Sequence, residues 1–70
     1  MDVERLAALL REAKEHHGTF EASAPAHHWS GWYAAYIVAR EQGSTAAEAS
    51  SAAGSHIERE LAERSSALEG

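Results

Sequence analysis

The chain has 70 residues, no cysteine and a formal net charge of −5 from eleven acidic and six basic side chains. This length allows one domain with a small core, and the lack of cysteine excludes disulfides, thiolate zinc sites and cysteine nucleophiles. The negative charge argues against nucleic acid and anionic membrane surfaces as partners, and it favours a cationic ligand or partner.

The composition predicts an all-α protein. Alanine is abundant, and β-branched residues are too few and too scattered for a sheet. No stretch approaches the roughly 20 apolar residues of a membrane span, and Met1–Arg5 lack the basic start and apolar run of a signal peptide. We therefore expect a cytoplasmic protein with a single helical domain over residues 1–70. Because so small a core is marginal, a homodimer is expected to complete the compact bundle of three main helices.

The first predicted helix covers residues 2–17. Asp2 is a suitable N-cap, and Gly18 is a suitable stop. The helix can also run through Gly18 to residue 22 at a cost of about 1 kcal/mol, which would keep Phe20 in register with the apolar side. Pro25 ends whatever precedes it, so residues 23–26 form the predicted connection. The apolar side is predicted to hold Val3, Leu6, Leu9, Leu10, Ala13 and His17.

The second predicted helix covers residues 28–42 and ends before Gly43. Its large side chains recur at i, i+3, i+4, i+7 and i+8, the spacing of one helix face. These are Trp29, Trp32, Tyr33, Tyr36 and Ile37.

The third predicted helix covers about residues 45–64, and its end is expected between residues 62 and 66. A frayed tail is expected to follow it. Thr45 and Glu48 have the spacing of a capping box. The first half is mostly alanine and serine, so the rings of the second helix are expected to lie over it. The inner side is predicted to hold Ala49, Ala52, Ala53, His56, Ile57 and Leu61, and it can extend to Leu68.

The aromatic face has two interpretations. Its rings can form the core, or they can form a contact surface, because Trp and Tyr carry polar groups and concentrate at interfaces. We predict a division, with Trp32, Tyr36 and Ile37 facing the bundle and His28, Trp29 and Tyr33 available to a ligand or partner. The full set of candidate binding residues is His27, His28, Trp29, Trp32, Tyr33 and Tyr36.

Five histidines in 70 residues raise the question of a metal site, yet no cofactor is predicted. Neighbouring helical residues point about 100° apart, and neither His-Glu-x-x-His nor Glu-x-x-His occurs. Two i, i+4 pairs remain, Glu12 with His16 and His56 with Glu60. If a metal binds, His27 or His28 is expected to meet His56 or His17. The candidate ligands are therefore His28, His56 and His17, whereas Glu12 and Glu15 are expected on a solvated face.

Three stretches of the chain carry a resemblance to a known group. These are residues 15–18, residues 24–36, which include the Trp-Tyr-Ala-Ala-Tyr run, and residues 44–49. They resemble small all-helical proteins from actinobacteria that often carry a bleomycin-resistance label, and some of these look like the small α-subunit of ring-opening extradiol dioxygenases. The resemblance implies a recurring small helical fold with an aromatic centre. It implies no catalytic residue.

These observations predict a small non-enzymatic binding or accessory module that uses the aromatic, histidine-flanked helix face. One version binds a flat or cationic small molecule, and the other packs on a larger enzyme. The alternative is a small histidine- or metal-dependent enzyme with its site between subunits, because acid–base catalysis needs a histidine in a water-excluded site.

Overall fold

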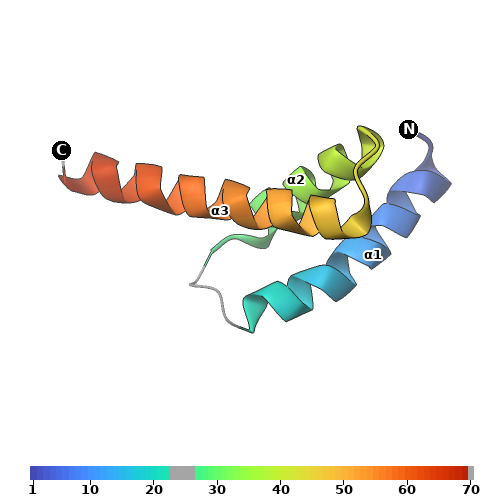
Figure 1. Cartoon of the computed structure of the whole chain (residues 1–70), viewed down its shortest axis with the longest axis horizontal. Coiled ribbons are helices and arrows are strands. Elements are labelled where there is room, and N and C mark those ends of the chain that lie inside the picture. Colours follow the sequence, from blue (N-terminus) through green and yellow to red (C-terminus); the bar gives the residue numbers. More distant parts are fainter. Residues whose placement is uncertain (23–26, 70) are drawn as a thin grey trace.

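The computed structural model describes residues 1–22 and 27–69, and within these residues all regular structure is helical (Figure 1). The helices are α1 (Val3–Glu21), α2 (Trp29–Glu41) and α3 (Ala46–Glu69). The predicted all-α fold of three main helices is confirmed. The predicted connection, residues 23–26, lies outside the described residues.

Helix α1 begins as predicted and takes the longer of the two alternatives for its end. The side chain of Asp2 accepts a hydrogen bond from the Arg5 N–H at 2.7 Å, which satisfies a free donor of the first turn. The helix then continues through Gly18 to Glu21. Phe20 explains the continuation, because it packs against the core with its ring centre 6.0 Å from that of Trp32.

Helix α2 begins one residue later than predicted because His28 is its N-cap. The Nδ1 atom of His28 accepts a hydrogen bond from the Ser30 N–H at 3.2 Å. At the other end the Ser44 N–H binds the Ala39 carbonyl at 3.0 Å, and the Gly43 N–H binds the Arg40 carbonyl at 3.1 Å. This is a Schellman motif, which needs a left-handed residue. Gly43 supplies it with φ = +99°.

Helix α3 begins with the predicted capping box. The Thr45 N–H donates to Glu48 Oε1 at 2.8 Å, and the Glu48 N–H donates to Thr45 Oγ1 at 3.2 Å. These bonds lower the pKa of Glu48. The helix continues to Glu69, beyond the predicted end between residues 62 and 66. No glycine or proline occurs between Ile57 and Glu69 to stop it.

The core lies mainly between α2 and α3. Trp32 and Tyr36 are fully buried and stacked, with ring centres 5.2 Å apart and an angle of 13° between the rings. They share the core with Ala49 and Ala53 of α3, as predicted, whereas Ala52 is exposed and its predicted inward position is wrong. The rest of the core consists of Leu9, Ala13, Ala39 and Ile57.

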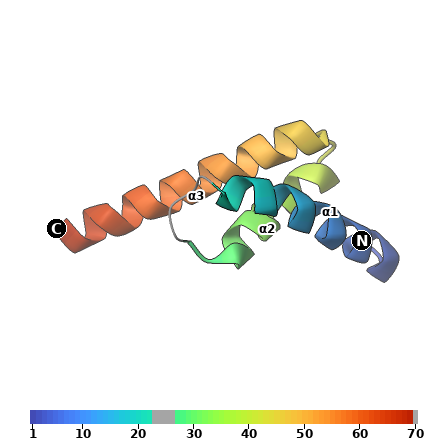
Figure 2. The ribbon, with the colours of Figure 1, turned by 90° about the horizontal axis from the view of Figure 1, so that it is seen from below.

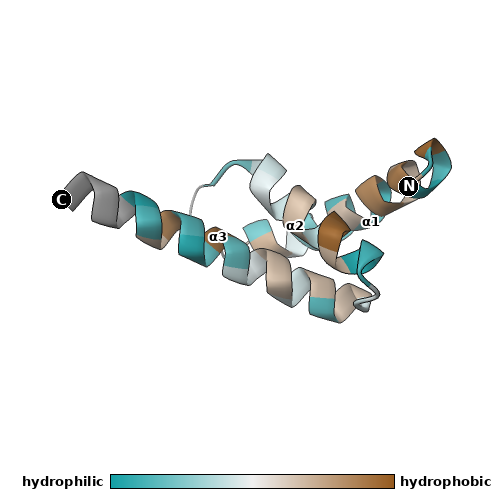
Figure 3. Ribbon diagram, turned by 90° about the horizontal axis from the view of Figure 1, so that it is seen from above, coloured by the Kyte–Doolittle hydropathy of each residue, from teal (hydrophilic) through white to brown (hydrophobic). Residues whose placement is uncertain are grey.

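The molecule is elongated, with extents of 43 × 23 × 19 Å. The later turns of α3 extend beyond α1 and α2 in both ribbon views (Figures 1 and 2). Apolar side chains at the start of α1 remain exposed, which corrects the inward position predicted for Val3, Leu6 and Leu10. Brown and teal segments alternate along these turns in Figure 3. Among the described residues, no helix combines the length and apolar character needed to cross a membrane.

Candidate functional site

The six candidate binding residues fall into separate environments. Trp32 and Tyr36 are fully buried, so they belong to the core and present no surface to a ligand. Trp29 is 56% exposed, His28 is exposed, and Tyr33 is partly buried. His28 and Trp29 are exposed as the predicted division requires, whereas Tyr33 is partly buried and packs against the core, as Ile37 does.

The three outer residues form a continuous surface at the start of α2, which we call the α2 entrance surface (His28, Trp29 and Tyr33). The rings of His28 and Trp29 are stacked, with centres 5.6 Å apart and 27° between their planes. Tyr33 meets Trp29 edge to face, with centres 5.3 Å apart and 83° between their planes. The Trp29 ring therefore packs against a neighbouring ring on either side in sequence, and more than half of it stays exposed.

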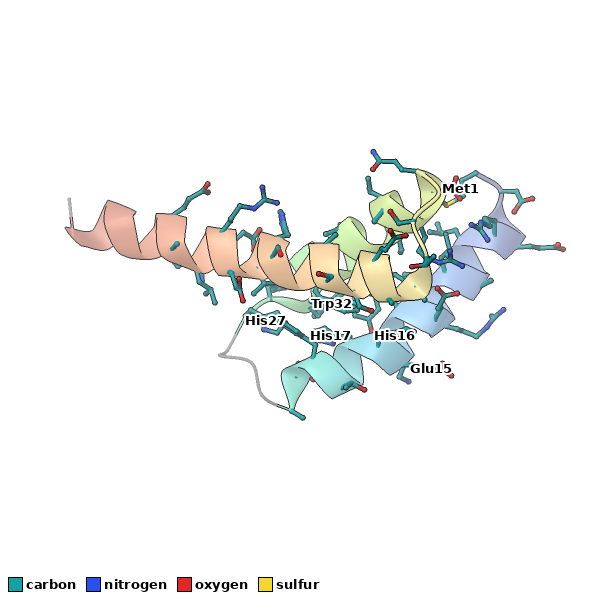
Figure 4. The ribbon with its side chains drawn as sticks, in the orientation of Figure 1. Met1, Glu15, His16, His17, His27 and Trp32 are labelled. Carbon is teal, nitrogen blue, oxygen red and sulfur yellow. The ribbon has the colours of Figure 1, made fainter. Side chains whose placement is uncertain are left out.

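His27 lies apart from that surface and pairs with His17 of α1 (Figure 4). Their Nε2 atoms are 3.0 Å apart. His17 is only 6% exposed, and its ring centre lies 5.2 Å from those of Trp32 and Tyr33. A buried imidazole needs a polar partner. His27 provides it and links the last part of α1 to the start of α2.

Glu21 lies beside this pair, and together the three residues offer side chains of the types that can coordinate a metal ion. Its Oε1 atom is 4.0 Å from His17 Nε2, and the ligand atoms of His17, Glu21 and His27 all lie within 4.8 Å of one another. The predicted meeting of His17 with His27 is therefore present. His28 and His56, the other candidate ligands, lie outside this group.

Glu21 is the residue that the sequence prediction missed. It is four residues after His17, which places both side chains on one face of a helix. The signal was present in the sequence, but it has meaning only if α1 continues through Gly18. His56 instead forms the predicted pair with Glu60, with His56 Nε2 3.2 Å from Glu60 Oε1.

A second polar cluster joins the middle of α1 to α2. The Tyr36 hydroxyl and the Arg40 Nε–H both donate to Glu12 Oε1, the latter at 2.7 Å. Arg40 Nη1 also donates to the Ser44 carbonyl at 2.8 Å. Glu12 and His16 form no direct hydrogen bond, although, beyond the bonds from Tyr36 and Arg40, the charge of His16 contributes to lowering the pKa of Glu12. The His16 ring stacks on Tyr36 with centres 5.5 Å apart. The solvated position predicted for Glu12 is wrong.

The electrostatics of this cluster follow from its hydrogen bonds. The bonds from Tyr36 and then Arg40 lower the pKa of Glu12. Burial, followed by the bond to Glu12, raises the pKa of Tyr36 to about 12. The carboxylate therefore stays charged and the phenol stays protonated at neutral pH. The cluster fastens two helices together and leaves no group of the pair free for acid–base work.

An open hollow on α3 is lined by His56, Arg59, Glu60 and Glu63. None of the six candidate binding residues lines it. It therefore does not serve the aromatic face.

Comparison with known proteins found no matching family model, no matching curated protein and no matching solved structure. The resemblance to small actinobacterial helical proteins stays a prediction.

Proposed function

We propose that this protein is a small non-enzymatic interaction module that binds a partner protein through the α2 entrance surface. The observation that carries the proposal is the position of Trp29. This large ring is 56% exposed, yet His28 and Tyr33 hold it in place. Tryptophan and tyrosine are enriched among the residues that dominate protein–protein binding energy.

The exposure of Trp29 favours a protein over a small molecule. Small-molecule sites are concave and cover most of their ligand. A ring that projects from the start of a helix is better suited to insertion into a pocket of another protein. The net charge of −5 favours a partner with a basic surface, because complementary charge speeds association.

A homodimer is part of the same proposal. A chain of 70 residues has a small core, and apolar side chains at the start of α1 are exposed. Val3, Leu6 and Leu10 recur at spacings of three and four residues along α1, so they can pack on a second copy. This dimer would leave the α2 entrance surface free for another protein.

One observation favours metal chemistry as a second candidate function, namely the pairing of His17 with His27. Catalysis also requires a substrate site beside these ligands. The hollow described above lies on α3, so the geometry supports metal binding more directly than a metal-dependent reaction.

Crosslinking tests the partner surface. A photoreactive phenylalanine analogue replaces Trp29 in the producing cell, and the same analogue replaces Val38 as a control. Val38 is a matched control because it is 54% exposed and lies on the same helix. We expect a crosslinked protein from position 29 and none from position 38.

Binding of the purified crosslinked protein then gives the size of the effect. Trp29→Ala should weaken its Kd by about tenfold or more, and Val38→Ala should leave it within about twofold. Helicity should be retained in both variants. The proposal is wrong if both changes weaken binding equally or if Trp29→Ala unfolds the chain. Sedimentation identifies a second copy as the partner if Trp29→Ala dissociates a dimer.

A further inference from the structure

We propose that His17, Glu21 and His27 bind one divalent first-row transition-metal ion of the Zn²⁺ class. The three side chains offer one ligand atom each, and these atoms lie within 4.8 Å of one another. Two belong to the last turns of α1, and the third comes just before α2. The site shares no residue with the α2 entrance surface, although the His17 ring contacts Tyr33 with centres 5.2 Å apart, and it does not depend on the function proposed for that surface.

The distance between the two histidines fits a shared ion. Zinc binds imidazole nitrogen at about 2.0–2.1 Å, which places two ligand nitrogens about 3.3 Å apart at the tetrahedral angle. The Nε2 atoms of His17 and His27 are 3.0 Å apart. Without an ion, one of these nitrogens must carry a proton that the other accepts. Metal binding requires that proton to move to the Nδ1 atom of its ring.

The position of Glu21 allows it to close on the same ion. Its Oε1 atom is 4.0 Å from His17 Nε2, and its side chain is 59% exposed. An exposed glutamate changes rotamer at small cost, so a change of side-chain rotamer can bring the oxygen closer to the two imidazoles. The exposed side of the site is also the route by which an ion enters and by which water reaches it.

The ligand set decides the class of ion. Two imidazoles and one carboxylate favour zinc, cobalt, nickel or copper over magnesium and calcium, which prefer oxygen ligands alone. Three protein ligands leave a fourth position open for water or an exogenous ligand. The buried ring of His17, held between Trp32 and Tyr33, gives the site one rigid ligand.

A bound ion would also stabilise the folded chain, because it would link α1 to the residue two positions before α2. An ion that binds the folded chain and not the unfolded chain stabilises it in proportion to the logarithm of its concentration above Kd. A structural pairing of two histidines without metal would give no such dependence. This difference separates the proposal from a purely structural role of the pair.

The test uses the full chain without an affinity tag. Titration with zinc chloride, followed by calorimetry, should give one ion per chain. Co²⁺ should give the visible absorption bands of a tetrahedral or five-coordinate site. Imidazole ¹⁵N spectra should show metal-bound Nε2 atoms for His17 and His27.

Matched variants decide which residues bind. His27→Ala should weaken zinc binding by at least about tenfold, since a three-ligand site loses one nitrogen, and Glu21→Gln should weaken it less. His56→Ala should leave affinity within about twofold. It is a matched control because His56 and Glu60, like His17 and Glu21, are four residues apart on one helix. Their Nε2 and Oε1 atoms are 3.2 Å apart. His17 is not varied, since removal of a buried ring would disturb the core.

Three outcomes would overturn the metal site. They are the absence of stoichiometric binding, an equal loss of affinity in His56→Ala and His27→Ala, and unchanged imidazole spectra in the presence of zinc. Trp29→Ala should keep full zinc affinity, so the metal site and the partner surface can fail independently.

Discussion

The two sides of α2 are built in different ways. Towards α3, the stacked rings of Trp32 and Tyr36 share an apolar core with Ala49, Ala53 and Ile57. The side chains of α3 are small there, so the helices approach closely. Two buried polar atoms of the described residues on this side, Trp32 Nε1 and Ser50 Oγ, have no hydrogen-bond partner.

Towards α1, by contrast, directional polar contacts add to the apolar packing of Ala13 and Phe20. Glu12 receives hydrogen bonds from Tyr36 and Arg40, and His17 pairs with His27. Arg5 and Glu41 form an outer ion pair, with Arg5 Nε 3.2 Å from Glu41 Oε1. Helix α1 has few contacts with α3, so these contacts to α2, together with those of Leu9, Ala13 and Phe20, hold it.

The two sides of α2 therefore contribute differently to stability and to the positioning of titratable groups. Burial of apolar area supplies most of the folding free energy, and that burial centres on α2 and α3. Polar networks instead fix geometry and position titratable groups. The side chains proposed to bind a metal ion lie where α1 meets α2. Changes on the two sides should differ in size and in pH dependence.

The largest effect is expected on the apolar side. Ile57→Ala should lower the free energy of unfolding by about 2–5 kcal/mol, because Ile57 is fully buried and its loss leaves a cavity. Urea unfolding followed by circular dichroism measures this. Val38→Ala, at an exposed position, should change it by less than about 0.5 kcal/mol. A loss below about 1 kcal/mol for Ile57→Ala would mean that the α2–α3 core does not dominate stability.

A smaller effect is expected on the polar side. Glu12→Gln should lower the free energy of unfolding at pH 7 by about 1–2 kcal/mol, because charge-assisted hydrogen bonds from Tyr36 and Arg40 are weakened. The exposed residue Glu15 provides the matched control. Glu15→Gln should change the free energy by less than about 0.5 kcal/mol.

The pH dependence identifies the Glu12 carboxylate as the cause. The pKa of Glu12 is lower in the folded chain than its ordinary value of 4.5. Its contribution is therefore fully present above pH 4.5 and is lost as the pH falls through the lowered pKa. The difference between the wild type and Glu12→Gln should shrink with acid. A constant difference between pH 7 and pH 3 would contradict the assignment.

Local signals in the sequence predicted most of the fold. The Thr45–Glu48 capping box, the Gly43 stop and the spacing of Trp29, Trp32 and Tyr36 depend on neighbouring residues alone. The alanines of α3 also indicated where the rings would pack. Each of these features is present in the structure.

The site was predicted only in part because it depends on contacts between helices. The meeting of His17 with His27 was one of several pairings that the sequence allowed, and Glu21 was missed because Gly18 was a plausible stop. Glu12 was placed on a solvated face, although its hydrogen bonds with Tyr36 and Arg40 of α2 are partly buried. Helical periodicity identifies a face but does not say which residue of another helix lies opposite.

The smallest effect, opposite in sign, is expected at Gly18, which lies in α1 between His17 and Glu21. A Cβ atom added at Gly18 would meet no atom of another part of the molecule within 4 Å. Inside a helix, glycine is less stable than alanine by about 0.5–1 kcal/mol. Gly18→Ala should therefore raise the free energy of unfolding by that amount, measured by urea unfolding. Gly43→Ala is the control and should lower it, because φ at Gly43 is +99° and alanine is strained there. A loss of stability in Gly18→Ala would mean that the last turn of α1 needs glycine. The contacts of His17 and Phe20 with the rest of the molecule, and not local helix propensity, would then keep this turn helical.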